Sequence, residues 1–158
     1  MSVPVRIGII GGIIIGLLQF YTLIACPPGF IGGIIFYSPQ ILYFACIYLS
    51  IRKTKAAGEA SFKGGMKAGV ITAFFIAIIW GIGFFIGMNN IDVHGQALYA
   101  LAHGTSKADV LAILKGWTQD AMIERTKFWM IPNFLLGFVV SLAVTIILRR
   151  KNPLNPEG

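Results

Sequence analysis

Four long apolar runs without an internal charge dominate this sequence. They cover about residues 7–25, 31–51, 68–87 and 128–148. Runs of about 20 apolar residues are long enough to cross a bilayer core of about 30 Å. Because lipid offers backbone N–H and C=O groups no partners, continuous runs of this kind are expected to be helices. The sequence therefore predicts an all-α membrane protein with four transmembrane helices.

Composition excludes the main alternatives. Ala, Val, Ile, Leu, Met, Phe, Trp, Tyr and Cys make up 56% of the 158 residues, and charged residues only 12%. Soluble domains carry about twice that share of charge, and disordered chains are less hydrophobic and more charged. The length fits one compact unit, so residues 1–158 are expected to form a single four-helix membrane domain.

Lysine and arginine are unevenly distributed between the segments that flank the runs. The formal net charge of +7 comes from the N-terminus, the loop at 52–67 and the tail after residue 148, whereas the charges between the third and fourth runs cancel. Positive segments stay on the cytoplasmic side. We therefore expect a multi-pass protein of a bacterial inner membrane, with both termini cytoplasmic and basic residues near anionic lipid headgroups. Since no basic face with base-stacking groups is visible, no nucleic-acid partner is predicted.

The segment at 89–127 is the longest stretch outside the runs, and it is predicted to be helical and extracytoplasmic. Ser106 followed by Asp109 is typical of a capping box that opens a short helix, which Gly116 ends. Thr118 is expected to cap a second helix that continues into the fourth run. This segment is the expected contact for a protein partner.

Small residues recur every four positions in two of the runs. Such stripes let helix backbones approach closely. Contact within one chain and contact between protomers both fit the pattern, and we expect the former. The predicted packing residues are Gly8, Gly12 and Gly16 in the first run, and Gly69, Ala73, Ala77 and Gly81 in the third.

A few polar or helix-interrupting residues lie at or near membrane depth, namely Gln19, Pro39, Gln40 and Asn133. Pro39 removes one backbone donor and leaves the carbonyl of Ile35 without its helical partner. Such a cluster fits either a polar lining for a small permeant or hydrogen bonds between helices beside a proline kink. We expect the second. The runs contain no ionisable Asp, Glu, Lys, Arg or His, which argues against ion-coupled transport.

The two cysteines suggest no disulfide. Cys46 is expected about 20 Å deeper in the membrane than Cys26, too far for a bridge. Residues 23–26 (Leu-Ile-Ala-Cys) resemble the lipobox of bacterial lipoproteins, in which Cys26 would be acylated. Pro27 and Pro28 directly after the cysteine are a poor cleavage context, so we expect a turn at this position.

No motif for catalysis, a cofactor or a metal is present. His94 and His103 do not have the spacing of known zinc sites. The sequence also lacks a nucleophile elbow, a phosphate-binding loop and an intramembrane carboxylate pair. We therefore predict no enzyme, no cofactor and no metal.

Two stretches resemble a known family. They are residues 51–53 (Ile-Arg-Lys) leading through 60–69 (Ala-Ser-Phe-Lys-Gly-Gly-Met-Lys-Ala-Gly), and residues 136–142 (Leu-Gly-Phe-Val-Val-Ser-Leu) leading through 147–151 (Ile-Leu-Arg-Arg-Lys). With the overall layout, they resemble a family of small four-span bacterial membrane proteins, of the Bacteroidota type, known only as a domain of unknown function. The resemblance implies the same topology and supplies no activity or catalytic residues to carry over to this chain.

Three functions fit these observations. The leading prediction is a non-catalytic scaffold or accessory subunit of an inner-membrane assembly, which contacts lipids and either a protein partner through residues 89–127 or further copies of itself. The alternative is a small oligomeric channel or transporter for an uncharged or small solute, built on Gln19, Pro39, Gln40 and Asn133. The third is a lipoprotein acylated at Cys26.

Overall fold

The computed structural model describes residues 1–25, 29–58, 61–90, 93, 101, 104, 106–116 and 118–150. This part of the chain forms five helices and no strand. The predicted all-α fold class is therefore confirmed for the described residues. The helices are α1 (Val3–Ala25), α2 (Gly29–Ala56), α3 (Phe62–Asn89), α5 (Lys107–Lys115) and α6 (Gln119–Arg150).

Three segments of the described helices are long and apolar enough to cross a membrane. They are Val3–Tyr21, Phe62–Asn89 and Gln119–Leu148. The sequence-based prediction of a membrane protein is confirmed at this level. The helix α2 is not among the three, although its 28 residues equal the length of α3. The fourth span and the orientation therefore remain predictions.

The helices α3 and α5 each begin directly after a capping serine. Ser61 Oγ accepts a hydrogen bond from the backbone N–H of Gly64 at 3.0 Å, and Ser106 Oγ accepts one from Asp109 N–H at 3.1 Å. Ser106 Oγ also donates to the Asp109 carboxylate at 2.7 Å. Each cap satisfies an N–H group that the first turn of a helix leaves without a helical partner. The predicted start of α5 after Ser106 is confirmed.

The fourth predicted run is part of a longer helix. Gly116 caps the C-terminus of α5, and Thr118 Oγ1 accepts from Ala121 N–H at 3.4 Å at the start of α6. The 32 residues of α6 rise about 48 Å, which exceeds the bilayer core. The second outer helix and the fourth run thus form one helix, as predicted.

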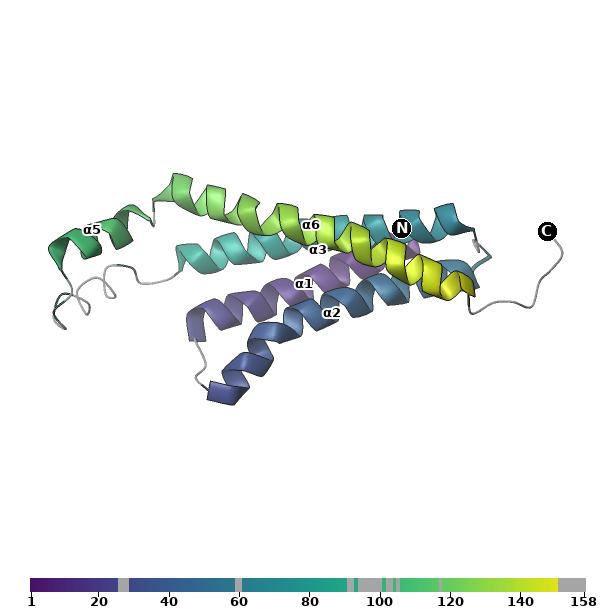
Figure 1. Cartoon of the computed structure of the whole chain (residues 1–158), viewed down its shortest axis with the longest axis horizontal. Helices are drawn as coiled ribbons and strands as arrows, with labels where there is room; N and C mark the ends of the chain where they lie inside the picture. The colour runs from purple at the N-terminus through teal and green to yellow at the C-terminus, as the bar shows by residue number, and fades with distance from the viewer. Residues whose placement is uncertain are drawn as a thin grey trace.

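Four long helices lie side by side, and α3 contacts the other three, most extensively α1 (Figure 1). Successive helices reverse direction, so α1 and α3 begin at the end of the bundle where α2 and α6 finish. We call this the basic end, because Arg6, Lys53, Lys55, Lys63 and Lys67 lie near these helix termini. The short helix α5 lies beyond the opposite end (Figure 1).

The interior of the bundle is apolar, and so is much of its outer surface. Large apolar side chains of α6 point outward, with Phe128 75% exposed and Ile131 59% exposed. An apolar outer surface suits contact with lipid, and a soluble monomer rarely exposes such a patch. The core cluster joins α1, α2 and α3 through Ile15, Tyr43, Ile47, Ile51, Ala73, Ile76 and Trp80.

Candidate functional site

Small residues of α3 face small and hydroxyl-bearing residues of α6. A Cβ atom added to Gly65 would lie 2.9 Å from Thr145 Cγ2, and one added to Gly69 would overlap Ser141. Both helices repeat these residues every four positions and run antiparallel, so successive pairs stay in register. We call the contact the α3–α6 seam. Its facing pairs are Gly65 and Thr145, Gly69 and Ser141, and Ala73 and Gly137.

The glycine stripe of α1 packs against a different face of α3. A Cβ added to Gly8 would lie 2.8 Å from Phe75 Cβ, and one added to Gly12 would lie 2.9 Å from Ile79 Cβ. A Cβ added to Gly83 of α3 would lie 2.9 Å from Gly16 Cα, so the two backbones touch there. The stripe of α1 therefore contacts α3 of the same chain, but it does not face the predicted stripe of α3, which turns toward α6.

The other two predicted packing residues lie near the far end of the seam. Ala77 is buried, and a Cβ added to Gly81 would overlap the side chain of Met130. Met130 occupies the space that the missing side chain leaves, so α3 and α6 approach each other along most of their shared length.

A buried hydroxyl connects three helices near the basic end. Thr72 Oγ1 on α3 lies 2.7 Å from Ser50 Oγ on α2, 3.1 Å from the carbonyl oxygen of Pro4 on α1 and 2.9 Å from that of Ala68. The Thr72 hydroxyl has one proton and can therefore donate only one hydrogen bond. It either donates to one of the two carbonyl oxygens and accepts from the Ser50 hydroxyl, or it donates to the Ser50 hydroxyl. We call these four residues the Thr72 junction.

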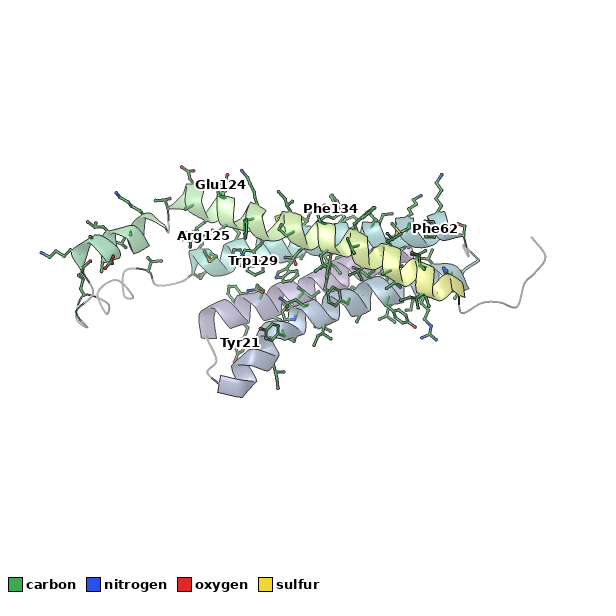
Figure 2. All side chains as sticks on the ribbon, in the orientation of Figure 1. Tyr21, Phe62, Glu124, Arg125, Trp129 and Phe134 are labelled. Atoms are coloured by element: carbon green, nitrogen blue, oxygen red, sulfur yellow. The ribbon has the colours of Figure 1, made fainter. Side chains whose placement is uncertain are left out.

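The structure brings Gln19 and Asn133 together. Trp80 Nε1 on α3 donates to Gln19 Oε1 on α1 at 3.3 Å, and Gln19, Trp80 and Asn133 line one cavity between α1, α3 and α6. Trp129, labelled in Figure 2, borders the same cavity and packs on Phe84 with ring centroids 5.9 Å apart. The cavity measures about 10 Å³, which is room for about one water molecule.

Tyr43 forms the second polar contact of this region. Its side chain is 1% exposed, and its hydroxyl donates to the backbone carbonyl of Asn133 at 2.7 Å. A Cβ on Gly137 would overlap that hydroxyl, so Tyr43 reaches α6 only because residue 137 is glycine. The Asn133 amide donates to the carbonyl of Trp129 on its own helix at 2.7 Å.

Pro39 and Gln40 are placed near this cluster but outside its cavity. Pro39 is fully buried, and α2 continues through it as one helix that bends in its first half (Figure 1). Gln40 is half-buried and makes a polar contact of its own. Among the described residues, neither lines the cavity between Gln19 and Asn133.

Sequence reasoning missed several residues of these contacts. Tyr43, Thr72 and Trp80 were treated as ordinary members of apolar runs, and Gly137 only as part of a family motif. One signal was available, because Asn133, Gly137, Ser141 and Thr145 repeat every four positions, as the glycines of α3 do. The i, i+4 rule applied to small hydroxyl residues as well as to glycine would have found this stripe.

No metal-ligating group forms in the part of the chain that the structure describes. Within it, no three His, Cys, Asp or Glu side chains gather. His94 and His103, for which no metal site was predicted, and Cys26, the residue considered for acylation, lie outside the described residues. Cys46 is a free thiol, and its sulfur occupies the space beside Gly11, where a Cβ would lie 2.6 Å from it.

Comparisons of this chain with protein-family models, with curated proteins and with solved structures found no match. The resemblance to a four-span family of unknown function therefore remains a prediction from the motifs at 51–69 and 136–151.

Proposed function

We propose that this chain is a four-span protein of the bacterial inner membrane that works without catalytic chemistry, as a scaffold or accessory subunit. One observation carries this proposal. Several polar groups of the bundle interior bond to other helices, as Tyr43 does to Asn133 and Trp80 to Gln19. The cavity beside them has room for about one water molecule, so it is too small to hold a larger solute.

The placement of α2 and of the charges supports four spans with a cytoplasmic basic end. The 28 residues of α2 rise about 42 Å, enough to cross a bilayer core. The described acidic residues Asp109, Asp120 and Glu124 all lie on α5 or the start of α6. Figure 2 shows Glu124 far along the bundle from Phe62, which opens α3 at the basic end. This asymmetry matches the positive-inside rule.

The outer end of the molecule supports a role in assembly. Leu111 on α5 is 57% exposed, and α5 lies beyond the long helices (Figure 1). An exposed apolar side chain on an amphipathic helix suits contact with a protein partner or the membrane surface.

Gentle detergent extraction of the whole chain from its host, followed by quantitative mass spectrometry, tests this function. We expect a partner in fixed stoichiometry that is lost in Leu111→Glu and retained in Leu111→Met, which keeps the position apolar. Both variants should remain monodisperse. A uniform oligomer of this chain alone would contradict the role of accessory subunit.

A small channel or transporter is the second candidate, because Gln19 and Asn133 from different helices meet at one cavity. Flux of small uncharged solutes into proteoliposomes distinguishes the two functions. A conducting pathway predicts flux that falls strongly in Asn133→Leu and persists in Leu135→Ile, a lipid-facing control. A scaffold predicts the same background leak for all three proteins.

A further inference from the structure

A second cavity opens at the basic end of the bundle, between the first turn of α1, the last turn of α2 and the start of α3. Its volume is about 210 Å³, far more than a single water molecule needs. Among the residues that line it, Pro4, Thr54 and Ala68 are buried, whereas Ser2 and Lys67 are exposed. Val3, Ala57, Gly64 and Ile71 complete its lining. We call it the basic-end cavity.

Thr54 gives this cavity a buried hydroxyl group. Its side chain is 7% exposed, and its Oγ1 has no hydrogen-bond partner among the described residues. A threonine within a helix commonly donates to the carbonyl of the preceding turn. Thr54 does not, whereas the Thr72 hydroxyl lies 2.9 Å from the carbonyl oxygen of Ala68 in the preceding turn of its helix. A buried donor without a partner is rare in folded proteins and calls for a ligand or a water.

The electrostatic environment of the cavity favours an anion. Lys67 lines it, and the described acidic residues all belong to α5 and α6 near the opposite end. The N-termini of α1 and α3 point their positive dipole ends toward this end of the bundle. The C-terminus of α2 also lies here and opposes them, but Lys53 and Lys55 in its last turn compensate for its carbonyl groups.

We propose that the basic-end cavity binds a phosphate group, with Lys67 as its cation and the Thr54 hydroxyl as a donor. Two sources present this chemistry, the headgroup of an anionic phospholipid and phosphate free in solution. Basic pockets between helices at the cytoplasmic surface suit lipid headgroups. The site does not depend on the scaffold function, because it involves residues far from α5.

The test uses the purified full chain in dodecyl maltoside, with the thermal unfolding midpoint followed by tryptophan fluorescence. The probes are dioctanoyl phosphatidylglycerol, dioctanoyl phosphatidylcholine as the uncharged control, and sodium phosphate. We expect phosphatidylglycerol to raise the midpoint saturably and phosphatidylcholine to have little effect. A saturable rise with sodium phosphate alone would instead identify free phosphate as the ligand of the same site.

Two variants test whether the effect arises in this cavity. Lys67→Gln should weaken binding of the active probe about fivefold, the effect of one lysine near a membrane surface. Thr54→Val should weaken it about tenfold, because a hydrogen bond to a charged group is lost. Thr54→Val removes only an unpartnered hydroxyl, so the bundle should still fold. Lys115→Gln at the opposite end is the matched control for charge and should bind as the natural chain does.

Equal weakening in Lys67→Gln and Lys115→Gln would show only non-specific attraction and would overturn the proposal. Unchanged binding in both Lys67→Gln and Thr54→Val, or no binding of either phosphate probe, would overturn it as well. None of these results bears on the protein partner expected at α5, so the two proposals can fail independently.

Discussion

At the scale of single residues, the glycines of this bundle leave space for polar side chains and also let the helix backbones approach closely. Gly137 leaves space for the Tyr43 hydroxyl, and Gly69 leaves space for Ser141. The glycines themselves were visible in the sequence as packing residues. Their partners were not, because an i, i+4 pattern identifies a face of one helix but not the helix that it meets.

Gly137→Ala should destabilise the bundle by about 1–3 kcal/mol, since the new Cβ would overlap the Tyr43 hydroxyl and approach Ala73 Cβ at 2.5 Å. Unfolding of the purified protein in mixed micelles measures the change. Leu136→Ala, at the outward-facing neighbouring position, is the control. In the Gly137→Ala background, Tyr43→Phe should cost less than it does alone, because removing the hydroxyl relieves the overlap. Additive losses would refute this explanation.

Thr72→Val tests the Thr72 junction. The variant keeps the shape of the side chain but removes a hydroxyl within hydrogen-bond distance of α1 and α2. We expect a loss of about 1 kcal/mol in the free energy of unfolding, within the range for hydrogen bonds between membrane helices. Thr145→Val is the matched comparison, because Thr145 Oγ1 has no hydrogen-bond partner among the described residues. That variant should be neutral or slightly stabilising. An equal loss in the free energy of unfolding for Thr72→Val and Thr145→Val would show that the hydrogen bonds of the Thr72 junction do not stabilise the bundle.

At the scale of helices, local signals predicted helix starts better than helix lengths. Ser106 and Thr118 were predicted to begin helices, and they do. The apolar runs, however, predicted only the apolar part of each helix and not its full length. The helix α3 begins six residues before the predicted run at 68–87, at Phe62, because Ser61 caps a polar first turn that hydropathy does not register.

Ser106→Ala should weaken α5 by about 1 kcal/mol, because the variant removes the acceptor of the Asp109 N–H and leaves that group unsatisfied. Hydrogen–deuterium exchange should therefore become faster in residues 107–115, whereas exchange in α3 should not change. Lys107→Ala, which keeps the cap, should behave as the natural chain does. Faster exchange throughout the protein would mean that α5 supports the whole bundle.

At the scale of the whole molecule, the sequence predicted the number of long helices and their alternating direction but not which helices meet. The central position of α3 and the contact of its glycines with α6 follow from shape complementarity between side chains far apart in the sequence. The orientation of the bundle in the membrane is predicted from charge alone. The helices would make the same contacts with one another if the bundle were turned over in the membrane.

Cysteine labelling tests the orientation. In a background without Cys26 and Cys46, Lys115→Cys should react with a membrane-impermeant maleimide on spheroplasts. Lys55→Cys at the basic end should react only after the inner membrane is permeabilised. The reverse pattern would show that the basic end is extracytoplasmic. Labelling of both positions before permeabilisation would show that an even number of helices crosses the membrane between them.

The central position of α3 has a consequence for biosynthesis. The first two helices are synthesised before their shared neighbour, and α1 contacts α3 more extensively than it contacts α2. Until the ribosome has passed Asn89, the glycine stripe of α1 and the hydroxyl of Ser50 lack the partners that they have in the finished protein. Insertion of α3 should therefore commit the nascent chain to its final arrangement, with α6 closing against a surface that is already assembled.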